Sequence, residues 1–300
     1  MVCILPAFYW RRLFFRIRQF PFISLVSKAD RKSFWQNGYI LKEDFLPQNL
    51  FDELLVEVKA YNGSARQCVQ GDTITWRVFF DKNSLKGQPI ISKLATYKPF
   101  RRLLSYGSAR VERPMMYIQQ IRNSFEKGNS DPQKNFHSDT FHPTMKAWLF
   151  LEDVVPEKGP FTYVAGSHKP TLKRLKWDYE KSLTAAKAND GYTEKGSFRI
   201  TGQELAELGF DQIKPMLVKK NSFVMGNTYG FHRRGDSAPN ATRLEIYCSS
   251  RVSPFSILPG CGLMADIRDA VLNKYYAKKD AEATKKGSRA TWHKADGSVI

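Results

Sequence analysis

Three polar side chains place the strongest constraint on how this 300-residue chain can fold. His137 and Asp139 are separated by one residue, and His232 follows 232 − 137 = 95 residues after the first histidine. Two imidazoles and one carboxylate can occupy one face of an octahedral metal such as Fe(II), which leaves the opposite positions open. Residues i and i+2 of a strand project to the same side, so the first pair suits the end of a strand. The second histidine must then come from another strand that the fold brings alongside.

Arg243 lies a further 243 − 232 = 11 residues along the chain, which is far enough to stand on a neighbouring strand. From there its guanidinium could hold a small dicarboxylate through two parallel hydrogen bonds. Each feature alone is weak, because a His-x-Asp pair occurs by chance and a single histidine is more often a surface or core residue than a ligand. The chain is also not histidine-rich, with only five histidines. Taken in this order, the features indicate a non-haem iron oxygenase.

Three segments around these residues resemble a known family. The stretch 136–169 reads FHSDTFHPTMKAWLFLEDVVPEKGPFTYVAGSHK, and it closely resembles the phytanoyl-CoA dioxygenase family of Fe(II)/2-oxoglutarate oxygenases. The stretch 225–249 reads MGNTYGFHRRGDSAPNATRLEIYCS, and it resembles the strand that carries the second histidine in that family. An earlier stretch, 37–61, is similar to the family's opening strand and helix. The resemblance spans about residues 34–255, which is most of the chain.

The resemblance implies roles for four residues. His137, Asp139 and His232 would be the catalytic metal ligands, and Arg243 would bind the distal carboxylate of 2-oxoglutarate. The implied cofactor is Fe(II), the implied co-substrates are 2-oxoglutarate and O₂, and the implied reaction is hydroxylation of a substrate C–H bond. Asp139 favours this reaction, because related halogenases leave the carboxylate position empty for chloride.

Two further residues are candidate contacts of 2-oxoglutarate. Gln120 lies 137 − 120 = 17 residues before the first histidine, an offset at which related enzymes place a glutamine that contacts 2-oxoglutarate. Its neighbour Gln119 would face the other side of the same strand, so an error of one residue in register would exchange the two. Trp148 occupies the place of a pocket tryptophan in mammalian family members, although ordinary core packing explains it equally well.

Arg233 and Arg234 directly follow the second histidine and are candidate substrate-binding residues. Some relatives have a small hydroxyl residue at the position of Arg234, so their substrate pocket does not transfer directly to this chain. At the mouth of the site, the two arginines would attract a carboxylate or phosphate of the substrate. A turn that faces solvent is an equally open explanation for both.

Composition limits the class of partner. The net charge of +18 and the pI of about 9.7 favour an anionic partner. No recognition-helix or RNA-binding motif is visible, so we expect no nucleic acid to bind. The four cysteines form no C-x-x-C pair, which favours a reducing compartment, and we expect a cytoplasmic location.

The first 33 residues form a basic and aromatic arm. A helix from about residue 7 to 19 would place Trp10, Leu13, Phe14 and Ile17 at spacings of three and four residues. No apolar run approaches the ~20 residues that span a bilayer. Basic residues mixed with large aromatic ones favour a segment that lies in a membrane interface, on the inner face of the cytoplasmic membrane. The alternative is an arm that packs on the domain while its arginines pair with acidic surface groups.

Strand signals recur along the rest of the chain, at 39–41, 73–80, 115–122, 146–152, 161–165, 216–227 and 243–252. A helix with Pro47 in its first turn follows the first of them. The pattern predicts a mainly β fold with α-helices, namely a double-stranded β-helix of the jelly-roll or cupin-like type at residues 34–263, with N-terminal helices packed on it. A basic insertion at about 170–212 is expected to form helices and a mobile loop beside the site. Residues 264–300 are expected to form a basic helix and a flexible tail.

These features lead to one preferred function and two alternatives. The preferred one is a dioxygenase that hydroxylates an anionic substrate presented at a membrane. Resemblance to bacterial Kdo hydroxylases points to a Kdo sugar of Kdo-lipid A, in the inner core of lipopolysaccharide. The first alternative is a hydroxylase of an acyl-CoA or of a small soluble metabolite. The second is a non-catalytic basic protein that binds membranes or nucleic acid on a degenerate oxygenase fold.

Overall fold

The computed structural model describes residues 4–125, 129–188, 190–250, 253 and 255–295. In these ranges the strands are β1 (Tyr39–Lys42), β2 (Arg66–Gln70), β3 (Thr73–Phe79), β4 (Met115–Arg122), β5 (Met145–Phe150), β6 (Phe161–Val164), β7 (Ile213–Pro215), β8 (Phe223–Asn227), β9 (His232–Arg234), β10 (Thr242–Ser250) and β11 (His293–Lys294). The α-helices are α1 (Ile4–Gln19), α2 (Lys28–Asn37), α3 (Gln48–Lys59), α4 (Pro89–Thr96), α5 (Lys98–Ser108), α6 (Leu172–Thr184), α7 (Gly202–Glu207) and α8 (Leu263–Lys285). Short 3₁₀ turns cover Phe20–Leu25, Ser84–Gly87, Pro132–Lys134, Ala185–Lys187 and Thr193–Lys195.

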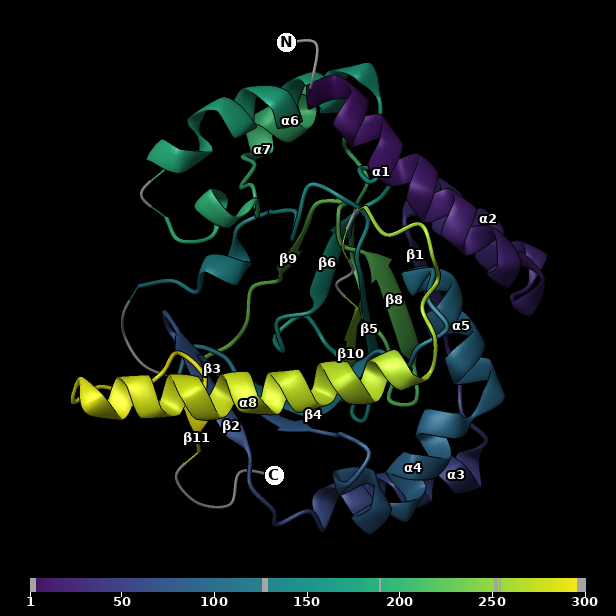
Figure 1. Cartoon of the computed structure of the whole chain (residues 1–300), viewed down its shortest axis with the longest axis vertical. Coiled ribbons are helices and arrows are strands. Elements are labelled where there is room, and N and C mark those ends of the chain that lie inside the picture. The colour runs from purple at the N-terminus through teal and green to yellow at the C-terminus, as the bar shows by residue number, and fades with distance from the viewer. Residues whose placement is uncertain (1–3, 126–128, 189, 251–252, 254, 296–300) are drawn as a thin grey trace.

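Two antiparallel sheets form the centre of the molecule (Figure 1). The larger sheet has the order β1-β8-β5-β10-β4-β3-β2-β11, and the smaller has the order β7-β6-β9. Because strands far apart in sequence alternate in the larger sheet, β10 lies between β5 and β4, and the distant parts of the chain meet there. This arrangement confirms the predicted double-stranded β-helix.

Side-chain alternation along the strands separates two cores. On β5, Ala147 and Leu149 face the helices, whereas Trp148 and Phe150 face the space between the sheets. Phe161 of the smaller sheet packs against Trp148, with the ring centroids 4.2 Å apart. The core between the sheets is therefore aromatic, and the site described below opens at one end of it.

Helices α2 to α5 cover the outer face of the larger sheet. Helix α3 follows Pro47, which fixes the backbone at the start of the helix, and buries one apolar face that includes Leu50, Leu54 and Val58. Phe100 of α5 packs on Phe223 of β8, with ring centroids 5.7 Å apart. These contacts support the larger sheet on the face that is opposite to the site.

The insertion at 170–212 forms helices as expected, and α6 and α7 pack on the smaller sheet. Arg174 of α6 is fully buried: it pairs with Asp178 at 3.1 Å and donates to the carbonyl of Ser167 at 2.8 Å. Helix α7 begins with a capping box in which Thr201 and Glu204 each accept from the other's backbone N–H. This segment therefore contains the helices that were expected and forms a buried connection to the strands of the site.

Helix α1 packs against α5 and α6 (Figure 1). Arg12, Phe15 and Arg18 are buried, whereas Leu13 and Ile17 are exposed. The arm therefore packs on the domain and also presents an apolar stripe to the outside. None of the helices in the described ranges combines the length and the apolar character needed to cross a membrane.

The C-terminal helix α8 is fixed at both ends to the body of the protein. Asp269 pairs with Arg113 at 2.6 Å, and Asp280 pairs with Arg66 at 2.5 Å. After the helix, β11 adds a short edge strand to β2, where His293 lies opposite Gln67. The edge of the sheet supplies backbone partners for β11 that no local pattern reveals. The end of the tail that was expected to be flexible, residues 296–300, lies outside the described residues.

Candidate metal centre and its cavity

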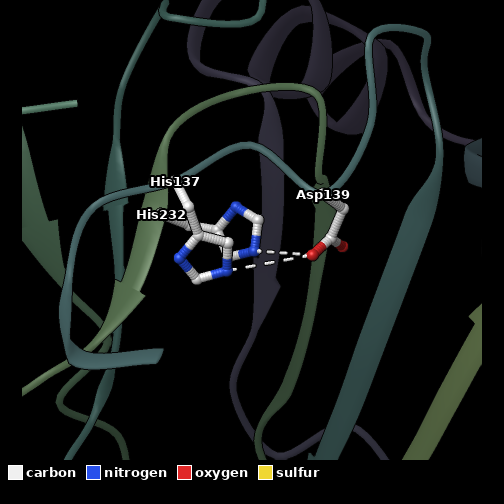
Figure 2. A group of neighbouring side chains, drawn as sticks. All are labelled: His137, Asp139 and His232. Atoms are coloured by element: carbon white, nitrogen blue, oxygen red, sulfur yellow. Dashed lines mark ion pairs between the residues drawn. The ribbon is translucent and has the colours of Figure 1, made fainter. Parts of the chain in front are cut away.

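His137, Asp139 and His232 meet at one end of the space between the sheets (Figure 2). The two histidines form an antiparallel bridge, in which each backbone N–H donates to the other's carbonyl, at 3.0 and 2.9 Å. This bridge places the imidazoles side by side with centroids 4.5 Å apart. The Oδ1 atom of Asp139 lies 3.8 Å from Nε2 of His137 and 3.6 Å from Nε2 of His232. One ion could therefore contact all three side chains.

The hydrogen bonds of the imidazoles prepare both rings for a metal. Nδ1 of His137 lies 2.8 Å from the carbonyl of Asn135, and Nδ1 of His232 lies 2.9 Å from the carbonyl of Gly230. A carbonyl accepts only from N–H, so each ring carries its proton on Nδ1 and a lone pair on Nε2. Both Nε2 atoms are buried without a hydrogen-bond partner in the part of the chain that the structure describes. The three side chains thus fit the facial set of two histidines and one carboxylate that holds Fe(II).

The electrostatics of the site keep the ligands in their metal-binding protonation states. Burial lowers the pKa of His137 well below its ordinary value, and the neighbouring His232 lowers it further. Burial alone would raise the pKa of Asp139, but Lys146 and the two imidazoles outweigh it and hold that pKa well below the usual range. His137 is therefore neutral and Asp139 ionised near neutral pH.

Lys146 is a neighbour of the metal ligands that the sequence did not suggest. It stands on β5, and its Nζ lies 2.8 Å from the carboxylate of Asp139. Its contact orients the carboxylate and balances its charge. The sequence feature that could have identified Lys146 is its position as the single lysine of an otherwise apolar strand, two residues before Trp148 and on the same face.

The triad opens into a cavity of about 380 Å³. The lining contains six cationic side chains but one acid, Asp139, among the described residues. The cationic residues are Arg77, Lys146, Lys195, Arg233, Arg234 and Arg243. The aromatic residues on the wall are Trp148, Phe161, Tyr192, Tyr247 and Trp292. Such a cavity favours an anionic molecule with a body that packs on aromatic rings.

Arg243 lines this cavity as predicted and belongs to a buried polar chain. Its Nε donates to Glu245 at 2.7 Å, and its Nη1 donates to the carbonyl of Gly159. Glu245 also accepts from Gln119, the residue directly opposite it on β4, and Gln119 accepts from Arg77 at 2.6 Å. The chain fixes the guanidinium of Arg243 from one side. Glu245 was absent from the sequence-based prediction, although its place two residues after Arg243 puts it on the same face of the strand.

The prediction of Gln120 as a contact of 2-oxoglutarate was wrong about the face of β4. Gln119 and Ile121 line the cavity, whereas Ile118 belongs to the core on the opposite face. Gln120 shares that opposite face, because side chains alternate along a strand. The register of the strand was misjudged by one residue, which moves every side chain to the other side.

The remaining candidates all lie on the cavity wall. Trp148 contacts Phe161 and is buried, so packing and pocket lining are both observed for this residue. Arg234 pairs at 2.9 Å with the fully buried Asp131. Arg233 makes a looser pair with the exposed Asp236, at 3.2 Å. Of the two arginines, Arg233 is therefore the freer to contact a substrate.

The chain is similar to several solved structures at low sequence identity. The epimerase SnoN, in complex with Fe³⁺, alpha ketoglutarate and nogalamycin RO, matches with a TM-score of 0.50 and 17% identity, over 78% of this chain and 91% of that chain. HygX from Streptomyces hygroscopicus, with nickel and 2-oxoglutarate bound, matches with a TM-score of 0.46 and 15% identity, over 75% and 86%. EctD from S. alaskensis, with 2-oxoglutarate and 5-hydroxyectoine, matches with a TM-score of 0.46 and 16% identity, over 75% and 76%. A comparison with curated protein sequences found no match.

The family model described as phytanoyl-CoA dioxygenase matches residues 34–204. These residues contain the His-x-Asp pair, while His232 and Arg243 lie beyond them and are brought to the same cavity by the fold. The match covers more than half of the chain. This chain therefore belongs to the phytanoyl-CoA dioxygenase family, and it is a non-haem dioxygenase that depends on Fe(II) and 2-oxoglutarate.

Proposed function

We propose that this dioxygenase hydroxylates a C–H bond of an anionic substrate presented at a membrane surface. The observation that carries the proposal is the cavity wall, where six cationic side chains face one acid that the metal requires. Arg243 is assigned to one carboxylate of 2-oxoglutarate, Lys146 pairs with Asp139 and Arg234 pairs with Asp131, so Arg77, Lys195 and Arg233 remain for the substrate. The first substrate to test is a Kdo sugar of Kdo-lipid A, which carries a carboxylate and to which the sequence resemblance points.

Residues on one wall of the metal-site cavity would bind both the iron and 2-oxoglutarate. His137, Asp139 and His232 would hold Fe(II), and Arg243 would take the distal carboxylate of 2-oxoglutarate, with Trp148 beside it. When bound, the iron and 2-oxoglutarate supply the activation of O₂, with succinate and CO₂ as by-products. The protein's own part is to fix the ligand geometry and to hold one C–H bond of the substrate near the metal.

Two basic residues are placed to hold the substrate. Arg233 follows the ligand His232 directly, and Lys195 is exposed at the edge of the cavity. Neither is committed to a buried ion pair, since the partner of Arg233 is the exposed Asp236. A carboxylate bound between them would stand beside the metal ligands. Removal of one such contact should weaken substrate binding at least about 10-fold, because a hydrogen bond to a charged group contributes roughly 1.5–3 kcal/mol.

The outer face of α1 supports presentation at a membrane. Trp10, Leu13 and Ile17 lie at helical spacing and are each about half exposed, and Phe20 continues the stripe. Arg16 lies next to this stripe and is also exposed. An apolar stripe flanked by cations is the pattern of a helix that lies in an anionic membrane interface, so we propose peripheral contact with the inner face of the cytoplasmic membrane.

The test is succinate release by the Fe(II)-loaded protein with 2-oxoglutarate, with and without Kdo-lipid A, beside His137→Ala. We expect the lipid to stimulate release several-fold, to gain the mass of one oxygen atom, and to do neither with the variant. Arg233→Met should raise the KM for the lipid about 10-fold without changing the KM for 2-oxoglutarate. Lys219→Met, which removes an exposed charge outside the cavity, is the matched control.

The same succinate assay, run also with an acyl-CoA and with a soluble acid, decides between the substrate classes. Turnover that is unchanged by Kdo-lipid A but stimulated by an acyl-CoA or a soluble acid would keep the oxygenase and refute the membrane-presented sugar. Stimulation that survives deletion of residues 1–30 on detergent micelles would refute the role proposed for α1. Absence of succinate release both with every substrate tested and in the control without substrate would favour a non-catalytic binding protein.

A further inference from the structure

A second cavity, of about 280 Å³, lies away from the metal centre. Its walls come from α1, α2 and the segment that leads into α6, and it shares no lining residue with the metal-site cavity in the part of the chain that the structure describes. Its volume is near the lower limit of small-molecule sites, which are about 300–1,000 Å³. Nothing in the reaction proposed above uses this space.

Arg12 brings a buried positive charge to the wall of this cavity, and it forms no ion pair with an acid among the described residues. The residue is 9% exposed, yet Nη1 and Nη2 have no hydrogen-bond acceptor among the described residues. Its guanidinium carbon lies 4.3 Å from the centre of the Tyr229 ring, and that of Arg174 lies at the same distance. Asp178, the nearby acid, is engaged by Arg174 at 3.1 Å and by the hydroxyl of Tyr229. Two buried guanidinium groups therefore share one carboxylate, and it is bonded to Arg174.

A buried cation without hydrogen-bond acceptors is costly for the free protein. Leaving a buried polar group unpaired costs about 1–3 kcal/mol, and more for a charged group. Burial accordingly lowers the pKa of Arg12. Groups of this kind in folded proteins are commonly paired with a ligand, an ion or water.

The rest of the lining shows what kind of ligand would pair with Arg12. Arg16 and Lys169 add two cations, and the described lining residues include no acid. Phe15, Phe34, Tyr106, Pro143 and Pro170 supply apolar surface. An inorganic anion would leave this apolar surface in contact with water, and a neutral lipid would leave Arg12 unpaired. A molecule with one anionic group and an apolar chain satisfies both parts of the wall.

We propose that this cavity binds a single acyl or alkyl chain that ends in a carboxylate or a phosphate, with the anionic group on Arg12. The site is independent of the metal centre and of the substrate proposed for it. Ligand binding stabilises the folded protein, because it supplies the acceptors that Arg12 lacks.

The test is calorimetric titration of the full-length protein with four probes below their micelle concentrations: dodecanoate, dodecyl phosphate, dodecanol and inorganic phosphate. We expect both amphipathic anions to bind at least about 10-fold more tightly than dodecanol or inorganic phosphate. Equal binding of dodecanol, or equal binding of inorganic phosphate, would overturn the proposal. Binding should be unchanged in His137→Ala, so failure of the proposed catalytic function leaves this result standing.

Variants of Arg12 separate a binding role from a packing role. Arg12→Met should weaken binding of both anions about 10- to 100-fold, while Arg12→Lys should retain most of it, since each charge-assisted contact is strong. Lys173→Met, which removes an exposed charge of α6 outside the cavity, should leave binding unchanged. In the free protein, Arg12→Met should keep or raise the melting temperature, because it removes the unpaired charge. A lowered melting temperature with anion binding retained would refute the inference.

Discussion

Arg174 offers the most direct test of how the insertion at 170–212 is held on the site. This side chain is 0% exposed and Asp178 is 1% exposed, so the pair lies entirely out of water. Besides Asp178, the guanidinium donates to the carbonyl of Ser167 at 2.8 Å and to that of Tyr229 at 3.2 Å. Its carbon also lies 3.7 Å from the centre of the Phe231 ring. The contacts therefore join α6 to the residues that lead into His232.

Arg174→Met keeps much of the side-chain volume and removes the charge. Asp178 would then be buried with the hydroxyl of Tyr229 as its remaining side-chain partner among the described residues. Loss of one partner from a buried ion pair costs about 3–5 kcal/mol, so we expect the free energy of unfolding to fall by that amount. Urea denaturation followed by fluorescence and circular dichroism measures the difference.

The same helix supplies a matched control. Lys176 lies 3.8 Å from Glu180 at the same i,i+4 spacing, but these side chains are 79% and 58% exposed. Lys176→Met should change the free energy of unfolding by less than about 0.5 kcal/mol. Arg174→Met combined with Asp178→Asn should cost less than Arg174→Met alone, because the stranded charge is gone. A loss below about 1 kcal/mol for Arg174→Met, or equal losses for the two single variants, would refute the reasoning.

Three further predictions concern the site and the second cavity. Gly230 lies two residues before the ligand His232, and a Cβ at this position would overlap the hydroxyl of Tyr163. Gly230→Ala should therefore weaken Fe(II) binding at least about 10-fold in a metal titration, and an unchanged affinity would contradict this. Gln119→Leu should raise the KM for 2-oxoglutarate about 5- to 30-fold while Gln120→Leu changes it less than 2-fold, and the reverse order would restore the sequence-based choice. Burial lowers the pKa of His168 from 6.5 to about 3, so protonation favours the unfolded chain: stability is full above pH 6.5 and declines as the pH falls toward 3. His168→Gln should lack this decline and gain up to about 2 kcal/mol relative to the parent between pH 7 and 4.5 in urea denaturation, whereas a pH-independent difference would argue against a half-buried imidazole that is neutral in the folded protein.

The sequence was sufficient for the strands that carry the chemistry, and the reason is local. The β3 and β4 segments are rich in β-branched and aromatic residues, and the structure has strands at Thr73–Phe79 and Met115–Arg122, close to the predicted ranges. His137, Asp139 and His232 are brought together as the metal-ligand spacing required. In these cases a local pattern predicts either the element, as for β3 and β4, or the ligand set, although His137 lies in an isolated bridge and not at the end of a named strand.

Other features depend on contacts that no local pattern contains. Gln119 and Gln120 are identical in type, so only the pairing of Gln119 with Glu245 across β4 and β10 decides which of them faces the cavity. The insertion forms the helices that its sequence predicts, but its attachment to the sheet depends on the buried Arg174, whose partners include a residue 55 positions away. Likewise, β11 exists because the edge of β2 offers backbone partners.

Two of the arginines on the cavity wall are already paired with buried acids, so they add little to the attraction of an anion. Arg243 is already balanced by Glu245 at 2.7 Å, so this pair contributes little net attraction for a dicarboxylate. Arg234 is likewise paired with Asp131. The positive field at the metal therefore comes mainly from Arg77, Lys195 and Arg233, which have no buried acid as a partner among the described residues. Because the anionic substrate depends on this field and 2-oxoglutarate depends on hydrogen bonds to the paired Arg243, added salt should raise the KM for the substrate more than the KM for 2-oxoglutarate. Salt that raised both KM values equally would contradict this division of roles.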